Sequence, residues 1–273
     1  MTPVFGLIIV GDEILSGKRA DKHLAQVIAL LGARGLSLAY ADYVGDDPVR
    51  LTATLKRAFG TADAVFCCGG IGATPDDHTR QSAAAALQRP LQPQPQAQAL
   101  IRERMQDMAR EQGQPFEPER ADNRQRLQMG VFPQGARIIP NPYNKIAGFS
   151  CDGPGGGAVH FVPGFPVMAW PMIEWVLEQQ YHPWFHQAPQ LEHSVVLYRA
   201  MESTLTPLML QIEAQHPGVK VFSLPSVDHP VHGLHIELGV KGAASLVPAA
   251  WQALRQALHQ MGAALGPEMV RER

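Results

Sequence analysis

The N-terminal third of the chain alternates between short apolar runs and amphipathic segments, and this alternation limits the possible folds more than any other feature. An uninterrupted apolar run is typical of a parallel strand that is covered on both faces. Apolar residues spaced three and four apart, with glycine after them, predict an amphipathic helix. The expected elements are strands at Val4–Val10, Leu36–Val44 and Ala64–Cys68, with helices at Asp21–Leu31 and Pro48–Phe59 between them. This order predicts an α/β fold with a doubly wound, mostly parallel, three-layer sheet.

Further elements are expected beyond a polar connection. Residues Gln88–Gln98 carry several prolines and lack a hydrophobic face, which predicts a loop or insertion. After it, the pattern favours helices at Ala99–Gln112 and Val167–Gln179 and short strands at Arg137–Pro140, Ala147–Cys151 and Val159–Pro163. The first domain is expected to close near Tyr181 and so to cover residues 1–181.

The remaining residues predict a second, smaller domain. His182–Pro189 is typical of a linker. The pattern then favours strands at Ser194–Tyr198, Val219–Leu224 and Leu234–Val240, with helices at Thr206–Gln215 and Leu246–Leu265. These elements predict a small α+β domain over residues 190–273, and a length of 273 residues agrees with two modest domains.

Charge and composition exclude several classes of protein. The chain has 23 Lys and Arg against 25 Asp and Glu, and 45% of its residues are apolar, which argues against a disordered chain and against a broadly basic nucleic-acid binder. The N-terminus lacks the basic lead-in of a signal peptide, and the longest uncharged stretch, Gly153–Ile173, contains prolines and glycines that disfavour a membrane helix. Three cysteines without a C-x-x-C pattern fit a reduced compartment. We therefore expect a cytoplasmic protein that binds neither membrane nor nucleic acid.

Glycine followed by carboxylate recurs after each of the first three predicted strands. The loops are Gly11-Asp12-Glu13, Gly45-Asp46-Asp47 and the longer segment Gly69–Thr79. In a parallel sheet the carboxyl ends of the strands share one edge, and ligands of open α/β folds bind beyond that edge. The sequence therefore predicts a binding site where these three loops meet.

The third loop combines features of an anion site and of a cation site. Its glycines let backbone amides turn toward an anion, and the following helix adds a favourable dipole. Asp76 and Asp77 lie in the same turn and would repel a phosphate at short range. We predict that a divalent cation, Mg²⁺ or a similar hard ion, lies between a phosphate or pyrophosphate and some of the carboxylates of Asp12, Glu13, Asp76 and Asp77.

A purely structural interpretation remains for parts of these loops. Thr74 would serve as an N-cap, with Pro75 as the first and Asp77 as the third residue of the next helix, an arrangement that needs no ligand. Asp47 before Pro48 is explained in the same way, as a helix cap. Capping and catalysis do not exclude one another.

Ligand-type side chains also occur outside these loops. His229, His232 and His235 are spaced three apart, and such a spacing alternates between the sides of a strand, so we expect no zinc site there. Lys145 is interpreted either as a phosphate contact or as a solvated lysine.

Several motifs together resemble a known family, the molybdopterin-binding (MoCF-type, MogA-like) domain, in the form that begins CinA-type competence/damage-inducible proteins. The similarity covers about residues 4–180. Residues 190–273 resemble, less closely, the KH-like α+β domain that follows in CinA-type proteins. The motifs that carry the resemblance are Gly11–Gly17, Val44–Asp47, Gly69–Thr79, Phe132–Ala136, Asn141-Pro142 and Pro163–Pro166.

The resemblance implies a molybdopterin or nucleotide ligand and a metal-dependent phosphate site. Family members are described as binding the pterin, adenylating it, or hydrolysing the pyrophosphate of ADP-ribose, and they form dimers or trimers. By position, Asp77 and Asp12 match the acidic residues associated with metal and catalysis, and Gly69, Gly70 and Gly72 match the phosphate-binding turn. The other residues predicted to contact the ligand are Gly11, Thr74, Thr79 and Lys145.

The chain also departs from the family pattern at three places, all relevant to ligand contacts. It has Asn144–Gly148 where Gly-Thr-Ala-Pro-Gly is common, His23 in place of an asparagine, and Val167 in place of a glutamate. Two hypotheses follow. The first is a molybdopterin- or nucleotide-binding protein that hydrolyses a pyrophosphate linkage, like an ADP-ribose pyrophosphatase. The second is a non-catalytic module that binds or carries molybdopterin in molybdenum cofactor biosynthesis.

Overall fold

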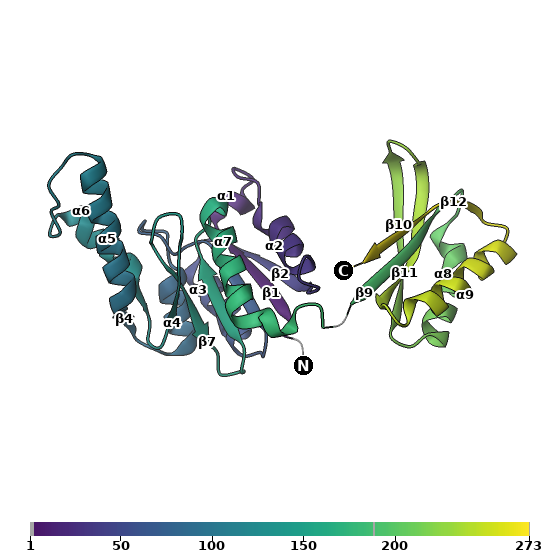
Figure 1. The fold of residues 1–273 in the computed structure, drawn as a ribbon, viewed down its shortest axis with the longest axis horizontal. Helices are drawn as coiled ribbons and strands as arrows, with labels where there is room; N and C mark the ends of the chain where they lie inside the picture. Colours follow the sequence, from purple (N-terminus) through teal and green to yellow (C-terminus); the bar gives the residue numbers. More distant parts are fainter. Residues whose placement is uncertain (1–2, 188, 273) are drawn as a thin grey trace. The chain divides into compact units, whose positions relative to one another are not determined.

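The computed structural model describes residues 3–187 and 189–272, so residue 188 of the expected linker lies outside the described residues. The chain divides into two compact units, Met1–Gly32 with Ser37–Trp184 and Ala33–Leu36 with Phe185–Arg273. Figure 1 labels most of their helices and strands. The short segment Ala33–Leu36 groups with the second unit, a division that the order of the sequence pattern does not suggest.

A mixed sheet forms the centre of the first unit. In the described part of this unit, four strands run parallel, and antiparallel pairs add the last two to one edge. The predicted α/β fold with a mostly parallel sheet is confirmed. In spatial order the six strands are β2 (Leu38–Val44), β1 (Phe5–Val10), β3 (Ala64–Cys68), β8 (Ala158–Val162), β7 (Gly148–Asp152) and β6 (Arg137–Ile139).

Helices cover both faces of this sheet because alternate strand residues point to opposite sides. Ile8 and Val10 of β1 share a buried cluster with Leu51 of α3 (Pro48–Phe59) and Ala83 of α4 (Thr79–Leu87). Helices α2 (His23–Gly32) and α7 (Pro166–Val176) contact each other, and they contact β1 and β8 respectively. The result is a three-layer arrangement with the parallel strands in its core (Figure 1).

The segment Gln88–Gln98, predicted as a loop or insertion, is not a continuous loop. It contains β4 (Leu91–Pro93), which pairs with β5 (Val131–Pro133), and the first turn of α5 (Pro95–Glu111). The helix begins there because the Gln94 side chain accepts a hydrogen bond from the Ala97 amide and Pro95 occupies the first turn. A shorter helix, α6 (Ala121–Leu127), follows, and the two form the projecting arm of this unit in Figure 1.

The second unit is an antiparallel sheet with two packed helices. Within its described residues the strand order is β10 (Val219–His229), β11 (Gly233–Ala243), β9 (Gln190–Tyr198) and β12 (Ala264–Glu272). Helices α8 (Glu202–Gln215) and α9 (Val247–Gln260) pack on it through buried residues such as Leu208, Ile212 and Leu254. The α+β character is confirmed, whereas the likeness to KH domains stays a prediction.

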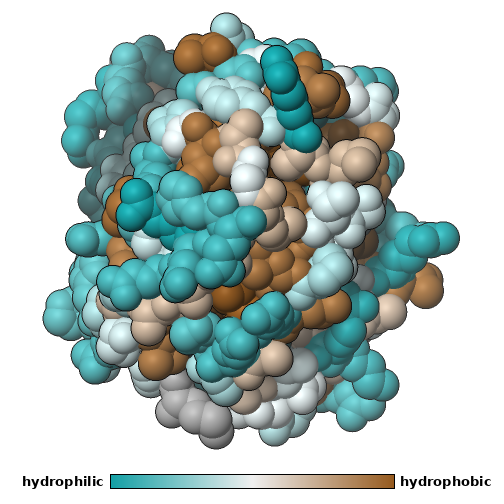
Figure 2. All heavy atoms as spheres, turned by 90° about the vertical axis from the view of Figure 1, so that its right-hand side faces the viewer, coloured by the Kyte–Doolittle hydropathy of each residue, from teal (hydrophilic) through white to brown (hydrophobic). Residues whose placement is uncertain are grey.

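The helix expected over Leu246–Leu265 is too long. It ends at Gln260, and Gly262 adopts a left-handed conformation with φ 67° that lets the chain turn back into β12. None of the helices in residues 3–187 and 189–272 combines the length and the apolar character that a membrane-spanning helix needs. On the face drawn in Figure 2, apolar atoms alternate with hydrophilic side chains.

Candidate functional site

The four parallel strands of the first unit end level with one another. In the strand register Val10 pairs with Val44, Ile9 pairs with Cys68, and Cys68 pairs with Val162. The loops that follow these strands therefore begin side by side, as the sequence predicts. They form the edge on which the candidate site is built.

The glycine turn after β3 is compact and intolerant of side chains. Gly69 and Gly70 have φ values of 111° and 67°, in the region that favours glycine. A Cβ atom at Gly69 would lie 2.4 Å from the Val10 carbonyl oxygen, and one at Gly70 would lie 2.2 Å from Oγ1 of Thr79. Thr79 is fully buried, and its hydroxyl donates to the Gly69 carbonyl at 3.0 Å. The buried Thr79 side chain thus stabilises the conformation of the turn.

The helix after this turn begins later than predicted, which corrects the capping interpretation. Helix α4 starts at Thr79 because the Thr79 amide still donates to the Gly70 carbonyl to close the glycine turn. Pro75 is therefore not helical. Instead, Oδ2 of Asp77 accepts hydrogen bonds from the Thr74 amide at 2.8 Å and from the Thr74 hydroxyl. Because a Cβ at Gly72 would lie 2.6 Å from the same oxygen, the Asp77 carboxylate lies against the glycine turn.

Arg80 is a site residue that the sequence reasoning missed. Its side chain is buried, and its guanidinium donates to the carbonyls of Ile71 at 3.0 Å and Gly72 at 2.7 Å. Burial lowers the pKa of Arg80, and the nearby Asp77 carboxylate opposes that shift. The available signal was an arginine among the small residues of an apolar helix face.

The first two loops are joined by a reciprocal pair of hydrogen bonds. The Asp12 amide donates to Oδ2 of Asp46 at 2.9 Å, and the Asp46 amide donates to Oδ1 of Asp12 at 3.2 Å. The Gly11 amide donates to the Val44 carbonyl at 3.0 Å, which aligns the two loops. Asp46 was not singled out from the sequence, although its loop was.

Acidic side chains from three loops lie at this edge of the sheet, and we call Asp12, Glu13, Asp46, Asp76 and Asp77 the acidic rim. Burial raises the pKa of Asp46 above its ordinary value, and the negative charges of Asp12, Glu13 and Asp76 add to this rise, while a backbone hydrogen bond from Asp12 opposes it. The predicted convergence of the loops thus produces mutual repulsion that a bound cation would relieve.

The loop that follows β8 also lies beside the glycine turn. Gly164 approaches the glycine turn, since a Cβ there would lie 3.5 Å from Cα of Gly69. The Gly164 carbonyl is 3.0 Å from Nε2 of the buried His23. The Arg19 guanidinium lies 5.6 Å from the centre of the exposed Phe165 ring and 3.5 Å from Oε1 of Glu13. The aromatic ring of Phe165 and the positively charged side chain of Arg19 therefore lie beside the acidic rim.

Lys145 is a partly exposed lysine whose ammonium group is paired with carboxylates. Its Nζ is 2.7 Å from Oδ2 of Asp107 and also pairs with Glu103, and both carboxylates belong to α5. Hydrogen bonding to Asp107 and then to Glu103 raises the pKa of Lys145. These contacts hold the ammonium group against α5 and make it a poor candidate for the phosphate contact.

The acidic rim fits a hard cation by donor type but is not a preformed cage. In the described ranges, no three His, Cys, Asp or Glu side chains are already arranged to hold a metal ion. Mg²⁺ is usually bound by one or two carboxylates together with water and substrate phosphates. The carboxylate oxygens of the rim match that preference, and such a site becomes complete only with its ligand.

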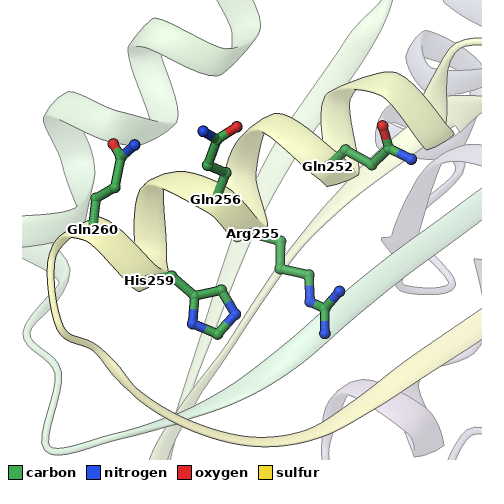
Figure 3. A pocket seen from close by; sticks show the side chains of 5 residues that line it. All are labelled: Gln252, Arg255, Gln256, His259 and Gln260. Carbon is green, nitrogen blue, oxygen red and sulfur yellow. The ribbon is translucent and has the colours of Figure 1, made fainter.

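A hollow on the surface of the second unit is a weaker candidate for the functional site than the acidic rim. It has a volume of about 540 Å³ and follows α9, and every lining side chain comes from that one helix. In Figure 3, Gln252, Gln256 and Gln260 point away from Arg255 and His259, so no reactive groups converge on it. The hollow is a surface feature of a single helix.

Comparison with known proteins identifies the family. Residues 6–193 match the family model described as a probable molybdopterin binding domain. The chain belongs to this molybdopterin-binding family. The resemblance seen in the sequence motifs is thereby confirmed, and the matched residues include the whole acidic rim and the glycine turn.

Relatives within this family include CinA-like proteins. The chain is 31% identical over 166 residues to a CinA-like protein of Gloeobacter violaceus, a match that covers 61% of this chain and 37% of that protein. A protein of Pyrobaculum calidifontis is 28% identical over 241 residues, with 86% of each chain covered. The crystal structure of CinA from Thermoplasma acidophilum, whose function is given as unknown, has a TM-score of 0.54 and 27% identity, covering 65% of this chain and 97% of that one. The chain thus spans less than half the length of the CinA-like protein from Gloeobacter.

Proposed function

We propose that this protein binds a phosphorylated small molecule, either a molybdopterin-type compound or an ADP-ribose-like nucleotide, and hydrolyses a pyrophosphate linkage in it. The observation that carries the proposal is the interaction of carboxylates from three strand-end loops beside a glycine turn that admits no side chain. Such a site offers amides to phosphate oxygens and carboxylates to a cation at one edge of the sheet.

The glycine turn would orient the substrate. The Gly69 amide already donates to the Val162 carbonyl, so we assign the other backbone amides of the turn to the phosphate oxygens, where they would stabilise the charge that develops during attack on phosphorus. Arg80 holds the carbonyls of Ile71 and Gly72 from below, which keeps those peptide groups in a fixed orientation. The turn lies so close to the end of β1 that a Cβ at Gly69 would be 2.4 Å from the Val10 carbonyl oxygen, which keeps the first and third loops side by side.

The acidic rim would hold Mg²⁺ or a similar ion through some of Asp12, Glu13, Asp76 and Asp77. When bound, such an ion neutralises phosphate charge and polarises the phosphorus atom. Both hydrogen bonds from Thr74 end on Oδ2 of Asp77, which leaves Oδ1 to position a water molecule or accept its proton. Attack of that water on one phosphorus breaks the bridging P–O bond and yields two phosphomonoesters. Asp12 is the second candidate for the base.

The test is turnover of ADP-ribose by the full chain in the presence of Mg²⁺, Mn²⁺ or Co²⁺. Asp77→Asn is expected to lower kcat by about 100-fold or more, the usual effect of removing a general base. Asp42→Asn is the matched control. Asp42 lies on β2, is paired with Arg57 of α3, and is outside the acidic rim. Unchanged turnover in Asp77→Asn would exclude Asp77 from the chemistry.

Binding without turnover would favour the second function, a molybdopterin-binding or carrier module. The two functions are separated by thermal-shift titrations of ADP-ribose, molybdopterin precursors and nucleotides, with and without Mg²⁺, run beside the product assay. A stabilised protein that releases no product supports the carrier. We also propose that the protein forms a dimer or trimer, which light scattering coupled to size-exclusion chromatography measures directly.

A further inference from the structure

Three histidine rings meet at the end of the β10–β11 hairpin, and we call His229, His232 and His235 the histidine tip. Their ring centroids are 5.0 Å apart for His229 and His232, 5.2 Å for His229 and His235, and 5.6 Å for His232 and His235. The sequence argument, that a spacing of three places such residues on alternating sides, is wrong here.

The strand register explains why the rings meet. Pairing of β11 with β9 reaches only as far as His235 and Tyr198, whereas β10 and β11 continue to pair beyond it, up to His229 and Gly233. A register irregularity lies between Ser226 and His229, and such irregularities redirect side chains. The tip therefore extends past β9 and bends, and simple alternation does not apply to it.

Hydrogen bonds already orient two of the rings. Nδ1 of His235 is 2.8 Å from the Gly233 carbonyl oxygen. A carbonyl only accepts, so Nδ1 is the donor, and in the neutral ring Nε2 is the nitrogen with the lone pair. Nδ1 of His232 is 3.1 Å from the Tyr198 hydroxyl. Partners of this kind, which fix the tautomer and the direction of the ring, commonly support metal-binding histidines.

The tip is also accessible from solvent. His235 is buried with 7% of its surface exposed, but His232 is only partly buried and His229 is exposed. The intervening Val231 is 78% exposed, so little of the protein covers the rings. An ion could reach the open side while the buried ring provides a fixed ligand.

We propose that the histidine tip binds a divalent transition-metal ion of borderline softness, with Zn²⁺ as the probe. Imidazole nitrogens bind Zn²⁺ at about 2.0–2.1 Å in a tetrahedral arrangement, which places ligating ring centroids roughly 5 Å apart. The three observed separations are compatible with this spacing, although they also lie in the range of ordinary ring contacts: His229 and His232 are stacked, and His235 is edge-on to both. Imidazole is also the donor that suits Zn²⁺, Ni²⁺ and Cu²⁺ better than Mg²⁺.

As they lie, the three rings do not form a metal site: in residues 3–187 and 189–272 no group of three His, Cys, Asp or Glu side chains could hold a metal ion, so binding requires the rings to turn. Nδ1 of the exposed His229 accepts from the amides of Val231 and His232, both at 3.2 Å. Rotation of the His229 ring gives up both of these bonds, so the metal–nitrogen bond has to offset their loss. The proposal is independent of the acidic rim and of pyrophosphate hydrolysis.

The experiment is isothermal titration of the full chain with ZnCl₂, with thermal unfolding measured in parallel. Wild-type protein is expected to bind Zn²⁺ with micromolar or tighter affinity and to unfold at a higher temperature when Zn²⁺ is present. His229→Gln and His232→Gln are each expected to weaken binding at least tenfold. Tyr198→Phe, which removes the partner of His232, is expected to weaken it by about tenfold.

Controls make the outcome decisive. His259→Gln removes an exposed histidine of α9 in the same unit and is expected to leave Zn²⁺ affinity unchanged. His229 is exposed, so its substitution tests the site even if the buried His235→Gln variant fails to fold. Wild-type protein that binds no Zn²⁺, or equal Zn²⁺ affinity in wild type, His229→Gln and His232→Gln, overturns the proposal.

Discussion

The acidic rim and the histidine tip gather ligand-type side chains in different ways. The rim stands on four strand ends whose register places the loops together, and its backbone is closed by hydrogen bonds from Gly11, Gly69 and Thr79. The tip stands on one hairpin that pairs only with itself beyond Tyr198. The rim offers carboxylate oxygens and the tip offers imidazole nitrogens. Sheet topology therefore fixes the first region, whereas local strand register and a few ring contacts fix the second.

A pair of glycine substitutions should show this difference most strongly. Gly69→Ala and Gly233→Ala both place a side chain at positive φ, 111° and 57° respectively. At Gly69 the new Cβ would also lie 2.4 Å from the Val10 carbonyl oxygen, whereas at Gly233 nothing lies within 4 Å. Urea unfolding is expected to show a loss of about 2–4 kcal/mol for Gly69→Ala and about 1 kcal/mol for Gly233→Ala. Equal losses would mean that the rim is no more constrained than the tip.

A second comparison concerns the histidines of the two units. His160 in β8 is fully buried, with Nδ1 2.8 Å from the Ser150 hydroxyl and Nε2 2.7 Å from the Tyr181 hydroxyl, unlike the accessible ring of His229. Burial, with a smaller contribution from Arg137, lowers the pKa of His160 from 6.5 to about 3. Between these two pKa values, His160 holds a proton in the unfolded chain but not in the folded one. The free energy of unfolding should therefore fall by about 1.4 kcal/mol per unit as the pH drops through this window.

Unfolding measured between pH 4 and 7 checks the His160 prediction. His160→Gln is expected to be less stable at neutral pH but to show a shallower pH dependence than wild type. Tyr181→Phe keeps the buried imidazole and should retain the wild-type slope. If His160→Gln and wild type share one slope, burial of this ring does not control the acid stability of the unit.

The smallest effect is expected at Lys145. Its ammonium group is paired with Asp107 and Glu103, so Lys145→Met should change the affinity for ADP-ribose by less than about twofold. Titration of ADP-ribose into both proteins measures this change. A tenfold loss of affinity would mean that Lys145 contacts the ligand and that the binding site reaches as far as α5.

The sequence predicted most of the fold because patterns and topology agree in the first unit. The apolar run of β1, the Asp47 cap of α3 and the three glycine loops carry local signals, and the parallel sheet then brings the loops together. The Asp47 side chain does accept from the amides of Val49 and Arg50, as a helix cap should. Local signals and sheet topology together therefore predict that these loops lie at one edge of the sheet.

Other features were missed because they depend on contacts that no local pattern carries. The start of α4 is set by the return of Thr79 to Gly70, and the burial of Arg80 follows from that turn. The strand β4 exists because it pairs with β5, more than thirty residues along the chain. The histidine tip depends on one register irregularity. In each case tertiary pairing decides the outcome.

The reciprocal bonds between Asp12 and Asp46 have a consequence for how the rim would respond to a ligand. Each carboxylate accepts a hydrogen bond from the backbone amide of the opposite loop. When a cation draws one of these carboxylates away, the amide it covered becomes a donor for an incoming anion. A single exchange of partners thus supplies both halves of a metal–phosphate pair, so metal and phosphate should bind cooperatively and in either order.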